Sequence, residues 1–145
     1  MAAAQGETSL STLLATLRAT LHPSTYVFIT FLPSAPLPET LYKQLLFREA
    51  EGITIISTLD SAKEHNIANY AFPCRMITCE VHSSLEAVGF MAVIASRLAE
   101  MGMGANPVSG FFHDHLFVPV GREEEAMECL EELAKENRET VKPKE

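Results

Sequence analysis

The alternation of hydrophobic and polar residues changes its period several times along the chain, and each change marks an expected element. From residue 74 to 82 the apolar side chains favour every second position, which is typical of a strand with one buried face. Between Leu85 and Leu98 they recur every three or four positions, which predicts an amphipathic helix. Ser83 precedes this helix and Glu86 follows in its first turn, so we expect the two residues to form a capping box.

The rest of the second half predicts a hairpin and another helix. Gly102 and Gly104 are expected to end the first helix. Strands are then predicted at residues 108–112 and 116–120, and an acidic amphipathic helix at residues 122–138. A parallel strand after a helix needs a right-handed crossover, and the hairpin adds an antiparallel strand. The order strand, helix, strand, strand, helix is typical of a ferredoxin-like α+β sandwich.

The first half repeats part of this order. Leucines at helical spacing predict a helix over residues 9–21, which the following His-Pro pair stops. Residues 25–32 are β-branched and aromatic on both faces and predict a central strand, and residues 45–50 and 53–58 predict a hairpin. The second half lacks a strand after its last helix. We therefore expect residues 25–32 to fill that edge of its sheet.

Composition narrows the class of protein. The 145 residues are 47% hydrophobic, which suffices for a packed core, and the net charge of -8 disfavours nucleic acid or an anionic membrane surface as a partner. No secretory signal pattern and no apolar run near ~20 residues is present, so we expect a soluble protein in the cytoplasm. Cys74, Cys79 and Cys129 form neither an even disulfide framework nor a CxxC pair, and are expected to be buried free thiols.

The run LAEMGMGANPVSGFFHDHLFVP, with the strand and helix before it, resembles the small-ligand-binding ACT domain. In that family a glycine-rich turn with an asparagine follows the first helix, and Gly104, Ala105 and Asn106 occupy that position here. The resemblance covers residues 25–135 and is strongest to two-unit ACT proteins of the CASTOR type and their small bacterial and fungal relatives. The sequence departs from the family pattern at Pro107, which replaces an aliphatic residue, and in the missing last strand.

This resemblance implies tandem ferredoxin-like (βαββαβ) ACT units, with antiparallel sheets covered by helices. The implied boundaries are a flexible tail at residues 1–7, a degenerate N-terminal unit at 8–72, a C-terminal ACT domain at 73–138 and a charged tail at 139–145. It implies a non-enzymatic regulatory protein that binds an amino acid at an interface between ACT units, as a homodimer or with a partner protein. No catalytic residue, metal or cofactor is expected.

Carried over by position, the resemblance nominates two groups of ligand-binding residues. These are His82, Ser83, Ser84 and Leu85 at the expected helix start, with Gly104, Ala105 and Asn106 opposite. A helix start offers free N–H groups to a carboxylate, an asparagine supplies a donor and an acceptor, and glycine permits close approach. The same residues also have structural explanations: the serines as helix caps, the histidine as a polar strand end and the asparagine as a turn former.

The run His113-Asp114-His115 is the other candidate for chemistry. Two histidines and a carboxylate can ligate zinc, but no further cysteine or histidine spacing completes four ligands. The alternative is a hairpin tip in which Asp114 accepts hydrogen bonds from nearby backbone N–H groups. No serine-nucleophile, phosphate-loop or HExxH motif occurs. A ligand sensor is thus the first hypothesis, an ACT-like dimerisation module without ligand the second, and a small ferredoxin-like enzyme the third.

Overall fold

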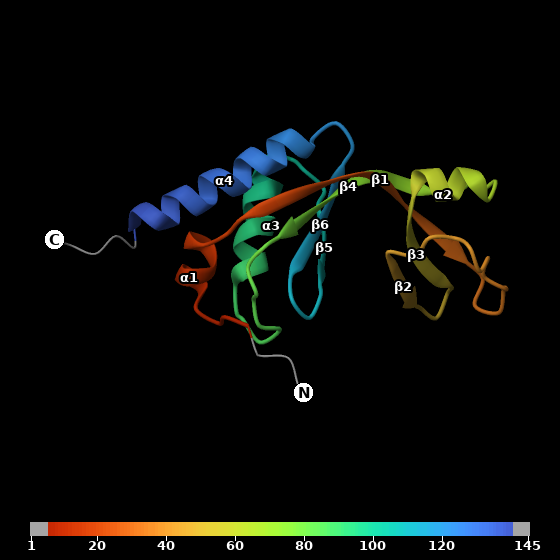
Figure 1. Cartoon of the computed structure of the whole chain (residues 1–145), viewed down its shortest axis with the longest axis horizontal. Coiled ribbons are helices and arrows are strands. Elements are labelled where there is room, and N and C mark those ends of the chain that lie inside the picture. Colours follow the sequence, from red (N-terminus) through yellow and green to blue (C-terminus); the bar gives the residue numbers. More distant parts are fainter. Residues whose placement is uncertain (1–5, 141–145) are drawn as a thin grey trace. The chain divides into compact units, whose positions relative to one another are not determined.

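The computed structural model describes residues 6–140, which divide into two units (Figure 1). Unit 2 is Pro23–Arg75, and unit 1 comprises the described residues before and after it. The strands β1 (Ala19–Phe31) and β4 (Ala71–Cys79) each contribute to both units. The expected tails lie largely outside the described residues, although helix α4 continues to Thr140.

Unit 2 has the strand order β2-β3-β1-β4 and one helix. β2 (Leu45–Arg48) pairs antiparallel with β3 (Ile53–Thr58), which confirms the predicted hairpin, and β3 also pairs antiparallel with β1. α2 (Leu59–Glu64) follows directly, because the Thr58 hydroxyl accepts a hydrogen bond from the Ser61 N–H at 3.1 Å and caps its start. The buried side chains of this unit include Val27, Ile29, Leu41, Ile53, Ile55 and Ala62.

Unit 1 has the strand order β1-β4-β6-β5 and three helices that pack together. Besides β1 and β4, its elements are α1 (Leu10–Ala15), α3 (Phe90–Glu100), β5 (Asn106–Ser109), β6 (Asp114–Pro119) and α4 (Glu123–Thr140). Its core joins one face of the strands to the helices through Ile77, Cys79, Leu116, Val118, Ile94, Leu98, Leu130 and Leu133. The fold is α+β, with helices packed on a sheet, as the sequence predicts.

A strand of the first half completes the sheet of unit 1, as predicted, but this strand, β1, begins earlier than expected. Residues 25–32 were expected there, whereas the part of β1 in this unit is its beginning, up to His22. The backbone N–H of Glu80 donates to the carbonyl of Arg18 at 2.6 Å beside it. The predicted helix over residues 9–21 is accordingly wrong beyond Ala15. Leucine spacings of four fit two strand periods as well as one helical turn, so the pattern alone was ambiguous.

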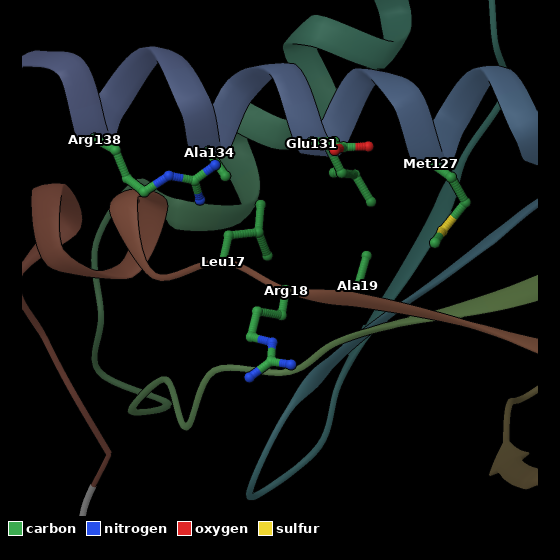
Figure 2. A pocket seen from close by; sticks show the side chains of 8 residues that line it. Leu17, Arg18, Ala19, Met127, Glu131, Ala134 and Arg138 are labelled. Carbon is green, nitrogen blue, oxygen red and sulfur yellow. The ribbon is translucent and has the colours of Figure 1, made fainter.

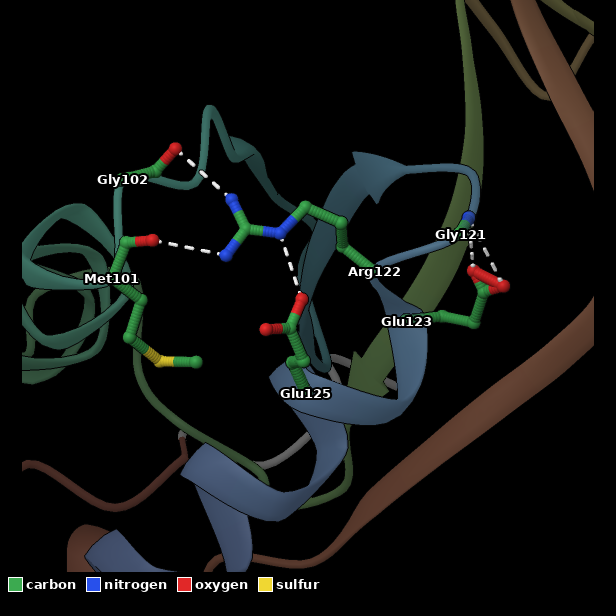
Figure 3. A network of polar contacts seen from close by, with 6 residues as sticks. All are labelled: Met101, Gly102, Gly121, Arg122, Glu123 and Glu125. Atoms are coloured by element: carbon green, nitrogen blue, oxygen red, sulfur yellow. Dashed lines mark hydrogen bonds and ion pairs between the residues drawn. The ribbon is translucent and has the colours of Figure 1, made fainter.

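A guanidinium group joins the start of α4 to the end of α3 (Figure 3). Arg122 donates to the carbonyls of Met101 at 2.9 Å and Gly102 at 3.0 Å, and its Nε donates to Glu125 at 2.7 Å. Carbonyls at a helix end lack partners within the helix, so this contact satisfies them. It also fixes the segment that leads into β5.

Among the described helices, none combines the length and the apolar character that a membrane crossing needs.

Candidate functional site

Residues 80–89 form an irregular loop in unit 1, not the start of a helix. α3 begins at Phe90, and its N-cap residue Gly89 has a φ of 89° and no side-chain cap. The predicted capping box at Ser83 is therefore wrong. Because a left-handed glycine interrupts the helical path just before Phe90, the apolar residues ahead of it stay outside the core. Leu85 and Val88 are 64% and 82% exposed.

The N-terminal segment lies along this loop and takes up part of its hydrogen-bonding capacity. The Glu7 N–H donates to the carbonyl of His82 at 2.7 Å, and the Ser84 N–H donates to the carbonyl of Glu7 at 2.9 Å. Gly6 fits only because it has no side chain, since a Cβ there would lie 2.3 Å from the His82 carbonyl oxygen. The sequence offered the Ser84 N–H to a ligand carboxylate, but this donor is already used within the chain.

Asp114 links the loop to the β5–β6 hairpin. One of its carboxylate oxygens accepts from the Ser83 hydroxyl at 2.9 Å, and the other from the Ser109 hydroxyl at 2.5 Å. The carboxylate thus bonds two side chains rather than the nearby backbone N–H groups that the sequence suggested. Ser109 was not among the predicted site residues, because only the register of the folded hairpin sets it opposite Asp114. The Asp114 carboxylate is thus buried, with two serine hydroxyls bonded to it.

Two small adjoining pockets open around these residues. The first, about 60 Å³, is lined by Ser83, Ser84, Leu85, Ala87, Phe90, Met91, Ser109, Gly110 and Asp114. The second, about 170 Å³, is lined by Gly6, His82, Ser84, Leu85, Glu86 and Phe111. Ser84 and Leu85 belong to both linings, so the two pockets adjoin, and we call them together the Ser84 crevice. Four predicted site residues, His82 to Leu85, therefore meet in it.

His82 carries an unsatisfied polar atom at this crevice. Its Nε2 is buried and has no hydrogen-bond partner among the residues that the structure describes. The imidazole lies against two half-exposed rings, with centroid separations of 6.4 Å to Phe111 and 5.4 Å to Phe112. A buried polar group without a partner costs on the order of 1–3 kcal/mol. His82 lines the second pocket, so a ligand that displaces the groups covering Nε2 can give it a hydrogen bond.

The second predicted group lies at the opposite end of β5. Gly104 and Ala105 precede the strand and Asn106 begins it, opposite Phe117 of β6, whereas Ser109 ends it opposite Asp114. A strand advances about 3.3 Å per residue, so Asn106 is about 10 Å from Ser109 along the chain. None of Gly104, Ala105 and Asn106 lines the Ser84 crevice. Within one chain the structure brings together the first group only.

The histidines near the hairpin form hydrogen bonds with oxygen atoms. Thr78 Oγ1 lies 2.7 Å from His22 Nε2 and 2.9 Å from His115 Nδ1, and His113 Nδ1 lies 3.1 Å from the Val81 carbonyl. Burial, together with the charges of His113 and His22, holds the pKa of His115 below its usual value. Within residues 6–140, no group of three or more His, Cys, Asp or Glu side chains is arranged to hold a metal ion.

The cysteine next to this network is not an activated nucleophile. Burial, with the charge of Asp114 contributing, raises the pKa of the Cys79 thiol to about 12. A thiol with such a pKa is protonated near neutral pH, whereas catalytic cysteines have lowered pKa values. All three cysteines are free and buried, as the sequence predicts.

A further hollow of about 280 Å³ lies between α4 and the segment before β1 (Figure 2). Figure 2 shows Met127, Glu131, Ala134 and Arg138 on the side of α4 that faces Leu17. The charged side chains at this hollow are exposed to solvent. It therefore lacks the buried, unsatisfied polar atom that distinguishes the Ser84 crevice.

Comparison with known proteins gives two family matches and several similar folds. Residues 5–75 match one model described as an ACT domain, and residues 71–132 match another. A solved protein of unknown function from Vibrio cholerae, described as a possible transport protein, is 35% identical, with a TM-score of 0.76 over 86% of this chain and 95% of that chain. No curated protein matches the chain.

Two more distant structures share the fold alone. A protein from Agrobacterium tumefaciens is 17% identical, with a TM-score of 0.68 over 81% of this chain and 89% of that chain. The regulatory subunit of aspartate kinase from Thermus flavus is 8% identical, with a TM-score of 0.57 over 79% of this chain and 95% of that chain.

Proposed function

Because the chain belongs to the ACT domain family, with two such domains in tandem, we propose that it is a regulatory protein that binds an amino acid without transforming it. ACT domains are regulatory modules, and the fold is shared with a regulatory subunit of aspartate kinase. The protonated Cys79 thiol offers no nucleophile at the site. Buried free cysteines fit a reducing compartment, and we place the protein in the cytoplasm.

The Ser84 crevice is the observation that carries this proposal. A buried carboxylate surrounded by serine hydroxyls suits the ammonium group of an amino acid, because Asp114 retains acceptor capacity beyond its two serine bonds. The nominated residues His82, Ser83, Ser84 and Leu85 form the wall of the same crevice. A ligand ammonium group beside Asp114 would replace its hydrogen bonds to water with a charge-assisted hydrogen bond to the carboxylate.

A second copy of the chain would supply the other group of nominated residues. β5 ends the strand order of unit 1, so one of its edges is open to another strand. Antiparallel pairing of β5 with its copy about Val108 sets Asn106 of one chain opposite Gly110 of the other, next to Ser109. Gly104, Ala105 and Asn106 of that copy then lie near the Ser84 crevice. We accordingly propose a homodimer with the ligand between ACT units.

Pro107 limits but does not prevent this pairing. Gly110 donates to the His113 carbonyl at 2.9 Å, and the alternation of an antiparallel ladder then directs the backbone groups of Pro107 and Ser109 away from β6. Proline lacks the N–H that the outer edge would otherwise present. The Ser109 N–H and the Pro107 carbonyl remain available at the outer edge of β5. The Ser109 N–H of each chain can therefore donate to the Pro107 carbonyl of the other chain across the two-fold axis.

A thermal-shift screen with the twenty amino acids tests the proposed function. A ligand at a hundredfold excess over its Kd stabilises the folded state by about 2.7 kcal/mol. The variant Asn106→Ala should lose this shift and keep its unliganded melting temperature, because Asn106 is exposed. Asn69→Ala, at another exposed asparagine, is the matched control and should keep the shift.

The principal alternative is an interaction module that dimerises without a ligand. It is favoured by the exposed apolar residues Leu85, Val88, Phe111 and Phe112, which a partner surface can cover. The screen separates the two proposals. If no amino acid at millimolar concentration shifts the melting temperature, and light scattering still gives a dimer, the ligand proposal is rejected in favour of this alternative.

A further inference from the structure

Resting on the proposed function, we infer that the ligand of the Ser84 crevice is an amino acid with an uncharged hydrocarbon side chain. The side chain lies between Leu85 and Phe111, the ammonium group bonds Asp114, and the carboxylate accepts a hydrogen bond from His82 Nε2. The lining, size and charge of the two pockets lead to this assignment.

The sizes of the two pockets assign the two ends of the ligand. The pocket at Asp114 has a volume of about 60 Å³, the smaller of the two, so we place the ammonium group there, beside the carboxylate. The adjoining pocket has about 170 Å³, the share of about six water molecules. This space suits the remaining atoms of a medium-sized amino acid. Because both pockets share Ser84 and Leu85, one molecule can occupy both.

The wall of the larger pocket is apolar where a side chain would lie. Leu85 and Phe111 line it, and both are more than half exposed without a ligand. A hydrocarbon group placed between them removes its own surface and theirs from water, which is the main source of affinity in small-molecule sites. Gly6 contributes only backbone to this pocket, and it approaches the His82 carbonyl closely.

His82 gives the pocket one polar partner for the ligand. Its Nε2 is buried and has no hydrogen-bond partner among the described residues, so a ligand that reaches it gains a bond that the free protein lacks. The Phe111 and Phe112 rings lie 6.4 Å and 5.4 Å from the imidazole and are half exposed, so contact with Nε2 requires that these rings make room. An imidazole N–H donates to a carboxylate, and this places the ligand carboxylate at the larger pocket.

The charges around the crevice select against acidic ligands. Asp114 lines one pocket and Glu86 the other, while neither lining contains a lysine or an arginine. A second carboxylate on the ligand would therefore meet two negative groups and no cation. The charges therefore select against aspartate and glutamate, and the apolar surface of Leu85 and Phe111 favours a hydrocarbon side chain over a basic one.

Isothermal titration of the full chain with leucine, phenylalanine, alanine, aspartate and lysine tests this inference. We expect leucine or phenylalanine to bind at least about tenfold more tightly than alanine, and aspartate to give no detectable binding. Tighter binding of alanine, aspartate or lysine than of leucine and phenylalanine would overturn the inference and leave the proposed function standing. If none of the twenty amino acids binds, the proposed function itself fails, and the inference with it.

Two leucine analogues and three variants test the assigned contacts. Leucine should bind at least tenfold more tightly than 3-methylbutylamine, which lacks the carboxylate, and than 4-methylpentanoate, which lacks the amine. His82→Phe keeps a ring but removes Nε2, so it should weaken leucine about tenfold and leave 3-methylbutylamine unchanged. Phe111→Ser should weaken leucine and not alanine, and Phe47→Ser, at an exposed phenylalanine of β2, should change neither. Equal loss of leucine and 3-methylbutylamine in His82→Phe would overturn the carboxylate contact.

Discussion

Replacing Asp114 with alanine should destabilise the protein, because this carboxylate holds the loop before α3 to the β5–β6 hairpin. It accepts hydrogen bonds from Ser83 at 2.9 Å and from Ser109 at 2.5 Å. Asp114 is only 8% exposed and Ser83 only 5%. After the substitution, the Ser83 hydroxyl would remain in a buried position without its acceptor.

The magnitude follows from the environment of each hydroxyl. A hydrogen bond to a charged group contributes about 1.5–3 kcal/mol, and an abandoned buried hydroxyl keeps its desolvation cost. Ser83 should account for about 2 kcal/mol of the loss, and Ser109, which is exposed and can bond water, for about 1 kcal/mol or less. We therefore expect Asp114→Ala to lower the free energy of unfolding by about 3 kcal/mol. Asp114→Asn, which retains an acceptor and adds donors, should cost about 1 kcal/mol.

Urea denaturation monitored by circular dichroism measures these differences through the midpoint and the slope. The double variant Ser83→Ala/Asp114→Ala should cost less than the sum of its two single variants, because each single variant already removes their shared bond. A change within about 0.5 kcal/mol for Asp114→Ala, the range of ordinary surface substitutions, would refute the assigned role. So would strict additivity of the two single variants.

Two further predictions concern the same unit. Burial and the nearby histidines lower the pKa of His115, so the unfolded chain binds a proton at this residue more readily than the folded chain does. The contribution of His115 to the free energy of unfolding is therefore fully present above about pH 6.5 and is lost as the pH falls through the lowered pKa. Chemical denaturation at pH 7 and pH 5 should show a smaller fall for His115→Gln than for the parent, and an identical fall would contradict the reasoning. Gly6→Ala should lower the free energy of unfolding by about 1–3 kcal/mol, because the new Cβ would lie 2.3 Å from the His82 carbonyl oxygen and displace the N-terminal segment. Faster hydrogen exchange at the Ser84 amide would report this displacement. Unchanged exchange would count against it.

The resemblance around the glycine–asparagine turn correctly identified the family, but the details of the first candidate site did not follow from sequence. Ser83 and Glu86 match a capping box, yet Ser83 donates to Asp114, a residue 31 positions further along the chain. The capping-box pattern considers only residues close together in sequence, so it gives no information about an acceptor such as Asp114 on another strand. Gly89 was the signal that the sequence reading overlooked. Its positive φ is incompatible with a helix that continues through it, so α3 can begin only at Phe90.

The local sequence pattern was enough to predict the α+β class, the β2–β3 hairpin and the acidic helix α4, because each rests on a periodicity that its own residues carry. Tertiary structure decided which segment completes the sheet of unit 1 and where α3 begins. It also decided that Gly6 and Glu7 lie on the loop at Ser84, and that Ser109 and Asp114 join the crevice. These outcomes depend on hydrogen bonds and burial between residues far apart in the chain, and local preferences of a few tenths of a kcal/mol yield to such contacts.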